Sequence, residues 1–359
     1  MLRVAPIVRS WYLSKRFSAT RPRLNSLLDA IALRALGDRP ARSRIAANSP
    51  VPELLIFVLA CLIAPPAFAQ TSTPRPRILG IAHVAIDTSD LPAARKFYTG
   101  VLGFEEPFAL TYSNASGSIA FIKVNDQQYL ELYSRSPQDA RHLSHFALVT
   151  DDAAAMKSFL VSRGVNIVGV LHKGNTGNLF FSVRDPDGHL IEFVQYEPGS
   201  WTDNDRGAHM PVARISNRIA RIGLRAGAPN PTLKFYKDIL GFEELRRGST
   251  FDGQSPSITL RLPDSSDCVE LLLYRDLPIA FQSSVQDRVY FERNDVSNLV
   301  ADLKLRSARS SVPYPRAFPF ASSQARGWAL YDPGGTLIEI AEPPRMEYQP
   351  VQATAALSR

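Results

Sequence analysis

The sequence predicts an α+β fold made of four similar units, each with one strand, one helix and about three further strands. Two observations support this prediction. Two segments of the second half repeat segments of the first half, and within each half the same order of apolar and amphipathic stretches occurs twice. The folded body is expected to begin near residue 78, after a disordered N-terminal leader.

The leader, residues 1–69, has the three parts of a secretory signal. Arg42 and Arg44 precede an uncharged apolar stretch at residues 54–64, and a small-x-small site follows, so cleavage is expected near Ala69/Gln70. The stretch is shorter than the roughly 20 residues of a spanning helix, which predicts no stable membrane span. The mature protein is therefore expected to be secreted or periplasmic. The Arg-rich residues 1–40 are either an overlong start or an organelle transit segment.

The net charge of +7 comes from the leader. Residues 1–49 carry a charge of +8 and residues 50–69 carry −1, so the body from Gln70 onward is neutral. A neutral body lacks the basic surface with which proteins follow a phosphate backbone. The charge pattern therefore predicts no nucleic-acid partner. A small-molecule partner is expected instead.

The first unit begins with a buried strand at residues 79–86. A helix is expected at 90–102, with Ser89 or Asp90 as its N-cap and Gly103 as its stop. Strands at 118–124 and 128–134 follow. The second unit repeats this order with a strand at 143–150, a helix at 152–163, and strands near 166–171, 178–184 and 189–196. These two units form a first domain at residues 78–197, and we expect a linker at 198–215, a second domain at 216–343 and a tail at 344–359.

Two motifs occur once in each domain. RKFYTGVLGFEE at residues 95–106 matches LKFYKDILGFEE at residues 233–244 in eight of twelve positions, at an offset of 138. DPDGHLIEF at residues 185–193 matches DPGGTLIEI at residues 332–340. Two such pairs in the same order indicate that the body is a duplication.

These motifs resemble those of the vicinal oxygen chelate superfamily, which includes glyoxalase I, fosfomycin and bleomycin resistance proteins and extradiol dioxygenases. The resemblance covers residues 78–343. It implies four βαβββ modules that form two cupped mixed-sheet domains with two modules each. It also implies that metal ligands come from the first and the last strand of a module.

At those places the sequence has His83 and Glu131 in module one and His145 and Glu192 in module two, with separations of 48 and 47 residues. A single histidine on a strand is usually structural, and a single glutamate usually faces solvent. Four such residues at equivalent positions indicate a site for one divalent metal ion, with Fe²⁺, Zn²⁺, Ni²⁺ and Mn²⁺ as candidates.

The second domain is expected to lack this site. Alignment on the repeats places Arg221 at the position of His83, Val289 at that of His145, Glu270 at that of Glu131 and Glu339 at that of Glu192. Without imidazoles, this domain should not hold a transition metal in the same manner. A structural ion pair with Arg221 and a separate ligand pocket are the alternatives for it.

The resemblance implies a metal-dependent enzyme that acts on a small molecule with adjacent oxygens. In glyoxalase-like isomerase or lyase chemistry, the ion polarises a carbonyl, and Glu131 or Glu192 moves a proton as general base. The four-residue ligand set favours this reaction.

Extradiol cleavage of catechols is the alternative reaction. It uses Fe²⁺ with two histidines and one carboxylate, which His83, His145 and Glu192 would supply. His172 would then serve as acid and base, although Ser182 stands where these enzymes have a tyrosine. A third interpretation is a non-catalytic protein that binds a small aromatic molecule or an antibiotic.

Phe121, Tyr133 and Phe181 are candidates for an apolar substrate pocket, although aromatic residues on alternating strands are more often core. Four modules in one chain can provide the edge pairing that two-module relatives achieve by dimerising. Both a monomer and a homodimer are therefore consistent with the sequence.

Overall fold

The computed structural model describes residues 73–111, 117–135, 142–250, 253, 255–282, 285–321 and 326–343. These residues belong to one compact unit that spans residues 71–359. The expected leader at 1–69 and the expected tail at 344–359 lie outside the described residues. Within the described ranges, no helix has both the length and the apolar character needed to cross a membrane.

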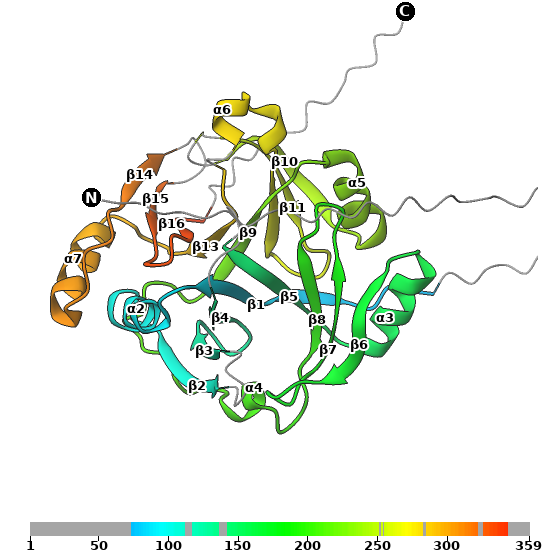
Figure 1. Ribbon diagram of the computed structural model, residues 1–359, viewed down its shortest axis with the longest axis horizontal. Coiled ribbons are helices and arrows are strands. Elements are labelled where there is room, and N and C mark those ends of the chain that lie inside the picture. The colour runs from blue at the N-terminus through cyan, green and yellow to red at the C-terminus, as the bar shows by residue number, and fades with distance from the viewer. Residues whose placement is uncertain are drawn as a thin grey trace, which may run out of the picture. The chain divides into compact units, whose positions relative to one another are not determined.

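The first half forms one eight-stranded mixed sheet with the order β2-β3-β4-β1-β5-β8-β7-β6 (Figure 1). At its centre β1 is parallel to β4 and antiparallel to β5, and β5 is parallel to β8. The strands are β1 (Ile78–Thr88), β2 (Glu105–Thr111), β3 (Ser118–Lys123), β4 (Tyr129–Ser134), β5 (Leu143–Thr150), β6 (Ile167–Lys173), β7 (Leu179–Arg184) and β8 (Leu190–Gln195).

Each module of this half has its helix where the sequence predicts it. α2 (Leu91–Lys96) continues as the π-helical η1 (Phe97–Val101), and α3 (Ala153–Ser162) follows β5. Asp90 caps α2 by accepting a hydrogen bond from the Ala93 N–H at 2.9 Å, which selects Asp90 over Ser89 as the N-cap. Gly103 ends the first helix with a φ of 76°, a conformation that favours glycine.

The second half repeats the arrangement with the order β10-β11-β12-β9-β13-β16-β15-β14. Its strands are β9 (Ile219–Arg225), β10 (Glu243–Ser249), β11 (Pro256–Arg261), β12 (Cys268–Leu272), β13 (Arg288–Glu292), β14 (Phe318–Ala321), β15 (Arg326–Tyr331) and β16 (Leu337–Ala341). Its helices are α5 (Pro229–Leu233), η2 (Lys234–Ile239), η3 (Tyr274–Asp276), α6 (Ile279–Gln282) and α7 (Leu299–Ser310), and α4 (Trp201–Asn204) lies between the sheets in sequence. Two eight-stranded mixed sheets with helices confirm the predicted fold class.

The two repeated motifs contact each other across the halves. The Tyr98 hydroxyl, on the first helix, donates a 3.0 Å hydrogen bond to Asp332 in the turn before β16. Tyr236, at the equivalent place in the second half, donates to Asp185 in the turn before β8, also at 3.0 Å. Both tyrosines are fully buried, and both halves contribute to one hydrophobic core. The motifs therefore join the two halves.

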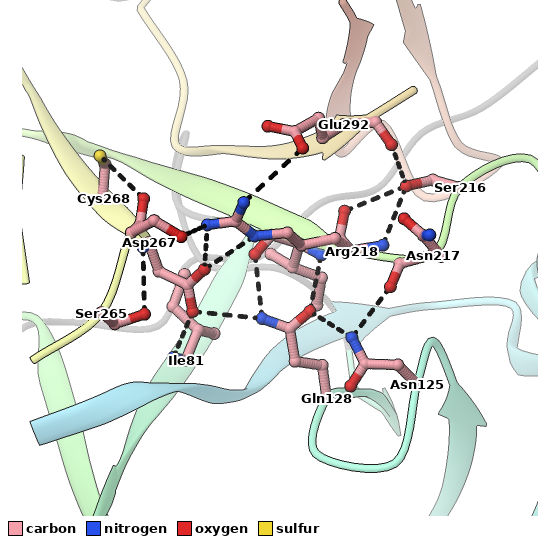
Figure 2. A network of polar contacts seen from close by, with 12 residues as sticks. Ile81, Asn125, Gln128, Ser216, Asn217, Arg218, Ser265, Asp267, Cys268 and Glu292 are labelled. Carbon is pink, nitrogen blue, oxygen red and sulfur yellow. Dashed lines mark hydrogen bonds and ion pairs between the residues drawn. The ribbon is translucent and has the colours of Figure 1, made fainter. Parts of the chain in front are cut away.

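A polar network also joins the first strand of each half (Figure 2). Asp267 accepts a 2.9 Å hydrogen bond from the Ile81 N–H and pairs with Arg218 at 2.7 Å. The Gln128 side chain bonds both the N–H and the carbonyl of Ile219, at 2.8 and 3.0 Å. Because Ile81 lies two residues before His83, the second half holds the strand that carries His83.

Candidate metal centre

The four predicted ligands come from the four central strands of the first sheet. His83 lies on β1, His145 on β5, Glu131 on β4 and Glu192 on β8. In the pairing register, Ala85 lies opposite both Glu131 and His145, and Ala147 lies opposite Glu192. Neighbouring strands place side chains at matching register on the same face of a sheet. The structure therefore brings all four side chains together.

Three of these residues form a compact cluster. The Nε2 atoms of His83 and His145 are 3.1 Å apart. The Glu192 carboxylate lies 3.5 Å from His83 Nε2 and 3.7 Å from His145 Nε2. One ligand atom from each of the three lies within 4.8 Å of the others, as the shared coordination of one metal ion requires.

Glu131 lies beside this cluster and has a partner of its own. Its Oε1 is 3.6 Å from His83 Nδ1, and its Oε2 is 3.9 Å from His145 Nε2. Tyr133 donates a 3.0 Å hydrogen bond to Oε2. The two carboxylates are therefore not equivalent, because Glu192 faces both Nε2 atoms whereas Glu131 contacts the opposite side of the His83 ring.

The pKa shifts of His145 and Glu192 favour the forms that bind a metal ion, whereas the shift of His83 favours a proton that the ion would have to displace. Burial lowers the pKa of His145, and the neighbouring carboxylates do not overcome this effect. Burial favours the neutral form of Glu192, but the two imidazoles outweigh it and lower its pKa. For His83, burial acts to lower the pKa, but Glu131 and Glu192 outweigh it and raise the pKa. A neutral imidazole and an ionised carboxylate are the forms that bind a metal ion.

The charge of the cluster also fits a divalent ion. With neutral imidazoles, the two carboxylates place two negative charges in a region where His145 is only 7% exposed and Glu131 only 8%. Buried charges are costly unless they are paired or bind a metal. One divalent cation would neutralise both carboxylates.

The second sheet has arginines at both histidine positions, which corrects one prediction. Arg221 stands at the position of His83, as predicted. Gly223, the counterpart of Ala85, lies opposite Arg288 and not opposite Val289. Arg288 is therefore the counterpart of His145. The alignment on the repeats was displaced by one residue, and such a shift moves a side chain to the other face of a strand. Val289 accordingly lies in the core.

These arginines pair with the two remaining carboxylates. Arg288 contacts Glu339 at 2.7 Å, and Arg221 contacts Glu270 at 3.5 Å. The Arg221 guanidinium also lies 4.3 Å from the centre of the Tyr290 ring. All four charged side chains are buried. The predicted structural ion pair is thus present, with a second pair beside it.

A cavity of about 270 Å³ adjoins the predicted metal site. His83, Glu131 and Glu192 line it, and so do Phe121 and Tyr133 from the predicted substrate pocket. Phe181 lies in the hydrophobic core instead, and its ring stacks on Phe193 at 5.4 Å. Strand alternation turns its neighbour Phe180 towards the cavity.

His172 is exposed and lines the same cavity. Its Nδ1 lies 2.9 Å from the Val170 carbonyl, so Nδ1 carries the proton and Nε2 is free to accept one. Its ring packs 4.3 Å from that of Phe180.

Sequence reasoning missed part of the cavity. Thr202 lines it, and Trp201 packs against its aromatic wall, although both lie in the segment predicted as a linker. The sequence signal for this segment was Lys123, a lysine at the end of an apolar strand. In the structure Lys123 is fully buried and pairs with Asp205, which follows α4, at 2.9 Å. A buried lysine requires an acidic partner.

Comparison with known proteins identifies the family. The model of the Glyoxalase/Bleomycin resistance protein/Dioxygenase superfamily matches residues 80–193. The uncharacterized protein YwbC of Bacillus subtilis is 30% identical over 123 residues, which cover 32% of this chain and 96% of that protein. A virulence protein of Salmonella typhimurium is also 30% identical over 123 residues, 32% of this chain and 83% of its own. The chain belongs to this superfamily.

Further comparisons extend the similarity. A lactoylglutathione lyase of Arabidopsis thaliana is 27% identical over 177 residues, 46% of this chain and 56% of that enzyme. A Mn(II)-bound glyoxalase from Novosphingobium aromaticivorans shares the fold, with a TM-score of 0.54 at 18% identity over 75% of this chain and 84% of its own. The 2,3-dioxygenase LapB from Pseudomonas sp. KL28 does so with a TM-score of 0.56 at 16% identity, over 76% and 94%.

Proposed function

We propose that this protein is a divalent-metal-dependent enzyme that converts a small molecule with two adjacent oxygens by glyoxalase-like isomerase or lyase chemistry. The observation that carries the proposal is the cluster of His83, His145 and Glu192, with Glu131 within 3.9 Å of both imidazoles. The names of two relatives, a lactoylglutathione lyase and a Mn(II)-bound glyoxalase, support this chemistry.

The protein side of the reaction follows from the two unequal carboxylates. A bound divalent ion would polarise the substrate carbonyl and stabilise negative charge on its oxygen. His83, His145 and Glu192 would hold the ion. Glu131 lines the cavity, lies outside the compact cluster and accepts a hydrogen bond from Tyr133. Its carboxylate is therefore the better placed of the two to take a proton from the substrate carbon.

Turnover of an α-ketoaldehyde adduct after loading with Ni²⁺ or Zn²⁺ tests this proposal. We expect turnover by the unchanged protein and a fall in kcat of at least about 100-fold for Glu131→Gln, a typical contribution of general base catalysis. The metal content of the variant serves as the control. No turnover of any such adduct by protein that holds its metal would contradict the isomerase assignment.

Extradiol ring cleavage is the second candidate, because the compact cluster contains two histidines and one carboxylate, the ligand set of many non-heme Fe²⁺ oxygenases. The position of His172 on the cavity, with Nε2 able to accept a proton, also favours it. Oxygen consumption with catechol after loading with Fe²⁺, lost in His172→Phe, would support this reaction. Tight ligand binding by protein that takes up no metal would instead support the non-catalytic interpretation.

The location of the protein stays a prediction. The apolar stretch at 54–64 supports a secreted or periplasmic protein, and fractionation of the cells that express the full chain would test it. Whether the chain is a monomer or a homodimer is a matter for sedimentation analysis.

A further inference from the structure

We propose that Tyr133 is a positioning residue that keeps Glu131 from binding the metal ion, so that three other side chains hold the ion and Glu131 stays available as the base. The inference rests on the proposed function, which assigns the proton transfer to Glu131. It adds the residue that separates the base from the ligands. Its basis is the hydrogen bond that the Tyr133 hydroxyl donates to Glu131 Oε2 at 3.0 Å.

Glu131 lies close to the imidazoles but outside the group of atoms that one ion can share. Within the described part of the chain, that group takes one ligand atom each from His83, His145 and Glu192, all within 4.8 Å of one another. The nearest Glu131 oxygens lie 3.6 Å from His83 Nδ1 and 3.9 Å from His145 Nε2. A histidine that binds a metal through one ring nitrogen commonly faces a carboxylate with the other. Glu131 is therefore placed to support His83 and not to serve as a fourth ligand.

The hydrogen bond from Tyr133 acts on the oxygen that is nearer to His145. It engages Oε2 of Glu131, which lies 3.9 Å from His145 Nε2. Hydrogen bonds to an ionised carboxylate are stronger than those between neutral groups. A shift of the carboxylate into the group of ligand atoms would change the geometry of this bond and weaken it. The bond therefore opposes coordination of the ion by Glu131.

The ring of Tyr133 is itself held by its neighbours. The Arg135 guanidinium lies 4.4 Å from the centre of the ring. The same guanidinium pairs with Asp87 on β1 at 2.7 Å and donates a hydrogen bond to Ser144 on β5 at 2.6 Å. The ring also meets that of His145 edge to face, with their centres 5.8 Å apart. Contacts with β1 and β5, the strands that carry the two histidines, therefore fix the tyrosine relative to the metal ligands.

The second sheet lacks the two histidines, and it also lacks this tyrosine. Glu270 is the counterpart of Glu131, and Leu272 stands two residues after it, where the first sheet has Tyr133. Glu270 accepts its phenolic hydrogen bond from Tyr290 on β13 instead, at 2.6 Å. A tyrosine on the same strand as the acid thus occurs in the half that also has the imidazoles.

The variant Tyr133→Phe tests the inference, because it removes the hydroxyl and keeps the ring. Without the hydrogen bond, Glu131 can bind the ion as a fourth ligand. We expect Zn²⁺, titrated in competition with a chelator, to bind at least about ten-fold more tightly. We expect kcat for the α-ketoaldehyde adduct to fall by at least about ten-fold, since the base is then bound to the ion. A merely structural role would not raise the affinity, so unchanged or weaker Zn²⁺ binding by the folded variant would overturn the inference.

The matched control is Tyr129→Phe. Tyr129 lies two residues before Glu131, as Tyr133 lies two residues after it, and both tyrosines line the cavity. The Tyr129 hydroxyl, however, bonds Asp205 at 3.3 Å. The Zn²⁺ affinity of this variant should equal that of the unchanged protein. Equal gains in the two tyrosine variants would overturn the inference.

A double variant, Tyr133→Phe with Glu131→Gln, assigns the gain in affinity to the acid. It has no carboxylate for the ion to recruit, so its Zn²⁺ affinity should match that of Glu131→Gln alone. A gain that persists in the double variant would overturn the inference. If Tyr133→Phe does not fold, Arg135→Gln replaces it with an expected gain of about three-fold, and no gain there would likewise count against Tyr133. Failure of the unchanged protein to bind Zn²⁺ would instead contradict the proposed function.

Discussion

Arg221 and Arg288 occupy in the second sheet the places of His83 and His145 in the first. Two guanidinium groups neutralise the two carboxylates beside them. In the first sheet the corresponding imidazoles bind a metal ion in their neutral form, so a divalent ion would balance the charge of the two carboxylates. Two equivalent pairs of buried carboxylates are thus balanced in different ways. Arginine side chains neutralise the pair in the second half, and on our account a metal ion neutralises the pair in the first.

Replacing both arginines should create a second metal site. In Arg221→His with Arg288→His, two imidazoles again face Glu270 and Glu339, so we expect two ions per chain where the unchanged protein holds one. Metal analysis after dialysis measures this ratio. The control Arg221→Gln with Arg288→Gln should stay at one ion. A folded double histidine variant with only one ion would show that residues other than these two decide metal binding.

Gly223 leaves room for the arginine on the neighbouring strand. A Cβ atom on Gly223 would lie 2.6 Å from Cγ of Arg288, closer than side-chain contacts permit. The first sheet has Ala85 at this position, opposite the smaller His145. Histidine therefore tolerates a neighbour that the arginine excludes.

The two carboxylates of the first sheet should differ in their effect on metal affinity. Glu192→Gln removes the charge that faces both Nε2 atoms, whereas Glu131→Gln removes one that contacts Nδ1 of His83. We expect the loss of Zn²⁺ affinity to be about ten-fold or more greater for Glu192→Gln, measured by competition with a chelator. Equal losses would contradict the different roles assigned to them.

At the scale of elements, the repeated motifs stabilise the junction between the halves. Tyr98→Phe and Tyr236→Phe each remove a buried hydrogen bond to an aspartate of the other half. We expect each to lower the free energy of unfolding by about 1.5–3 kcal/mol in urea titrations. Tyr314→Phe, whose side chain is exposed, should change it by less than about 0.5 kcal/mol. Unchanged stability in both buried variants would show that the motifs do not stabilise the junction.

Sequence reasoning located the elements because their signals are local. Capping by Asp90, the glycine stop at Gly103 and the alternation of apolar residues are all readable within a few positions. The four predicted ligands followed from the family resemblance and from their equivalent positions in repeated units. The partners of Tyr98 and Lys123 could not be predicted, because Asp332 and Asp205 are distant in sequence.

The misplaced residues have a common cause. Phe181 and Val289 each stand one position from the residue that reaches the predicted place, Phe180 in the cavity and Arg288 beside Glu339. Successive side chains of a strand point to opposite faces of the sheet, so an error of one position mistakes a core residue for a site residue. The pairing register of β9 and β13 resolves it for Arg288, and the residues that line the cavity resolve it for Phe180.

At the scale of the whole molecule, a buried histidine links the two halves. His189 Nδ1 lies 2.8 Å from Asp185, and its Nε2 lies 3.8 Å from Asp287 of the second half. Burial acts to lower the pKa of His189, but the contacts with these two aspartates outweigh it and raise the pKa to about 10. The protonated form of His189 therefore stabilises the junction between the two halves.

The sign of the pH dependence follows from this raised pKa. The stabilisation is complete below the unfolded value of about 6.5 and is lost as the pH rises towards the folded value, by at most about 1.4 kcal/mol per pH unit. We expect the stability advantage of the unchanged protein over His189→Thr to shrink between pH 6.5 and pH 9.5 in urea titrations. Thr336 stands at the equivalent place in the second half, so threonine fits such a turn. An advantage that is constant over this range would contradict the charged state of His189.

The account depends on one divalent ion held in the first half only, and metal analysis of the purified protein tests this most directly. We expect one ion per chain in the unchanged protein and in His209→Ala, whose histidine lies in the segment after α4. We expect none in His145→Ala, with the fold confirmed by circular dichroism. Equal metal content in His145→Ala and the unchanged protein would contradict the account.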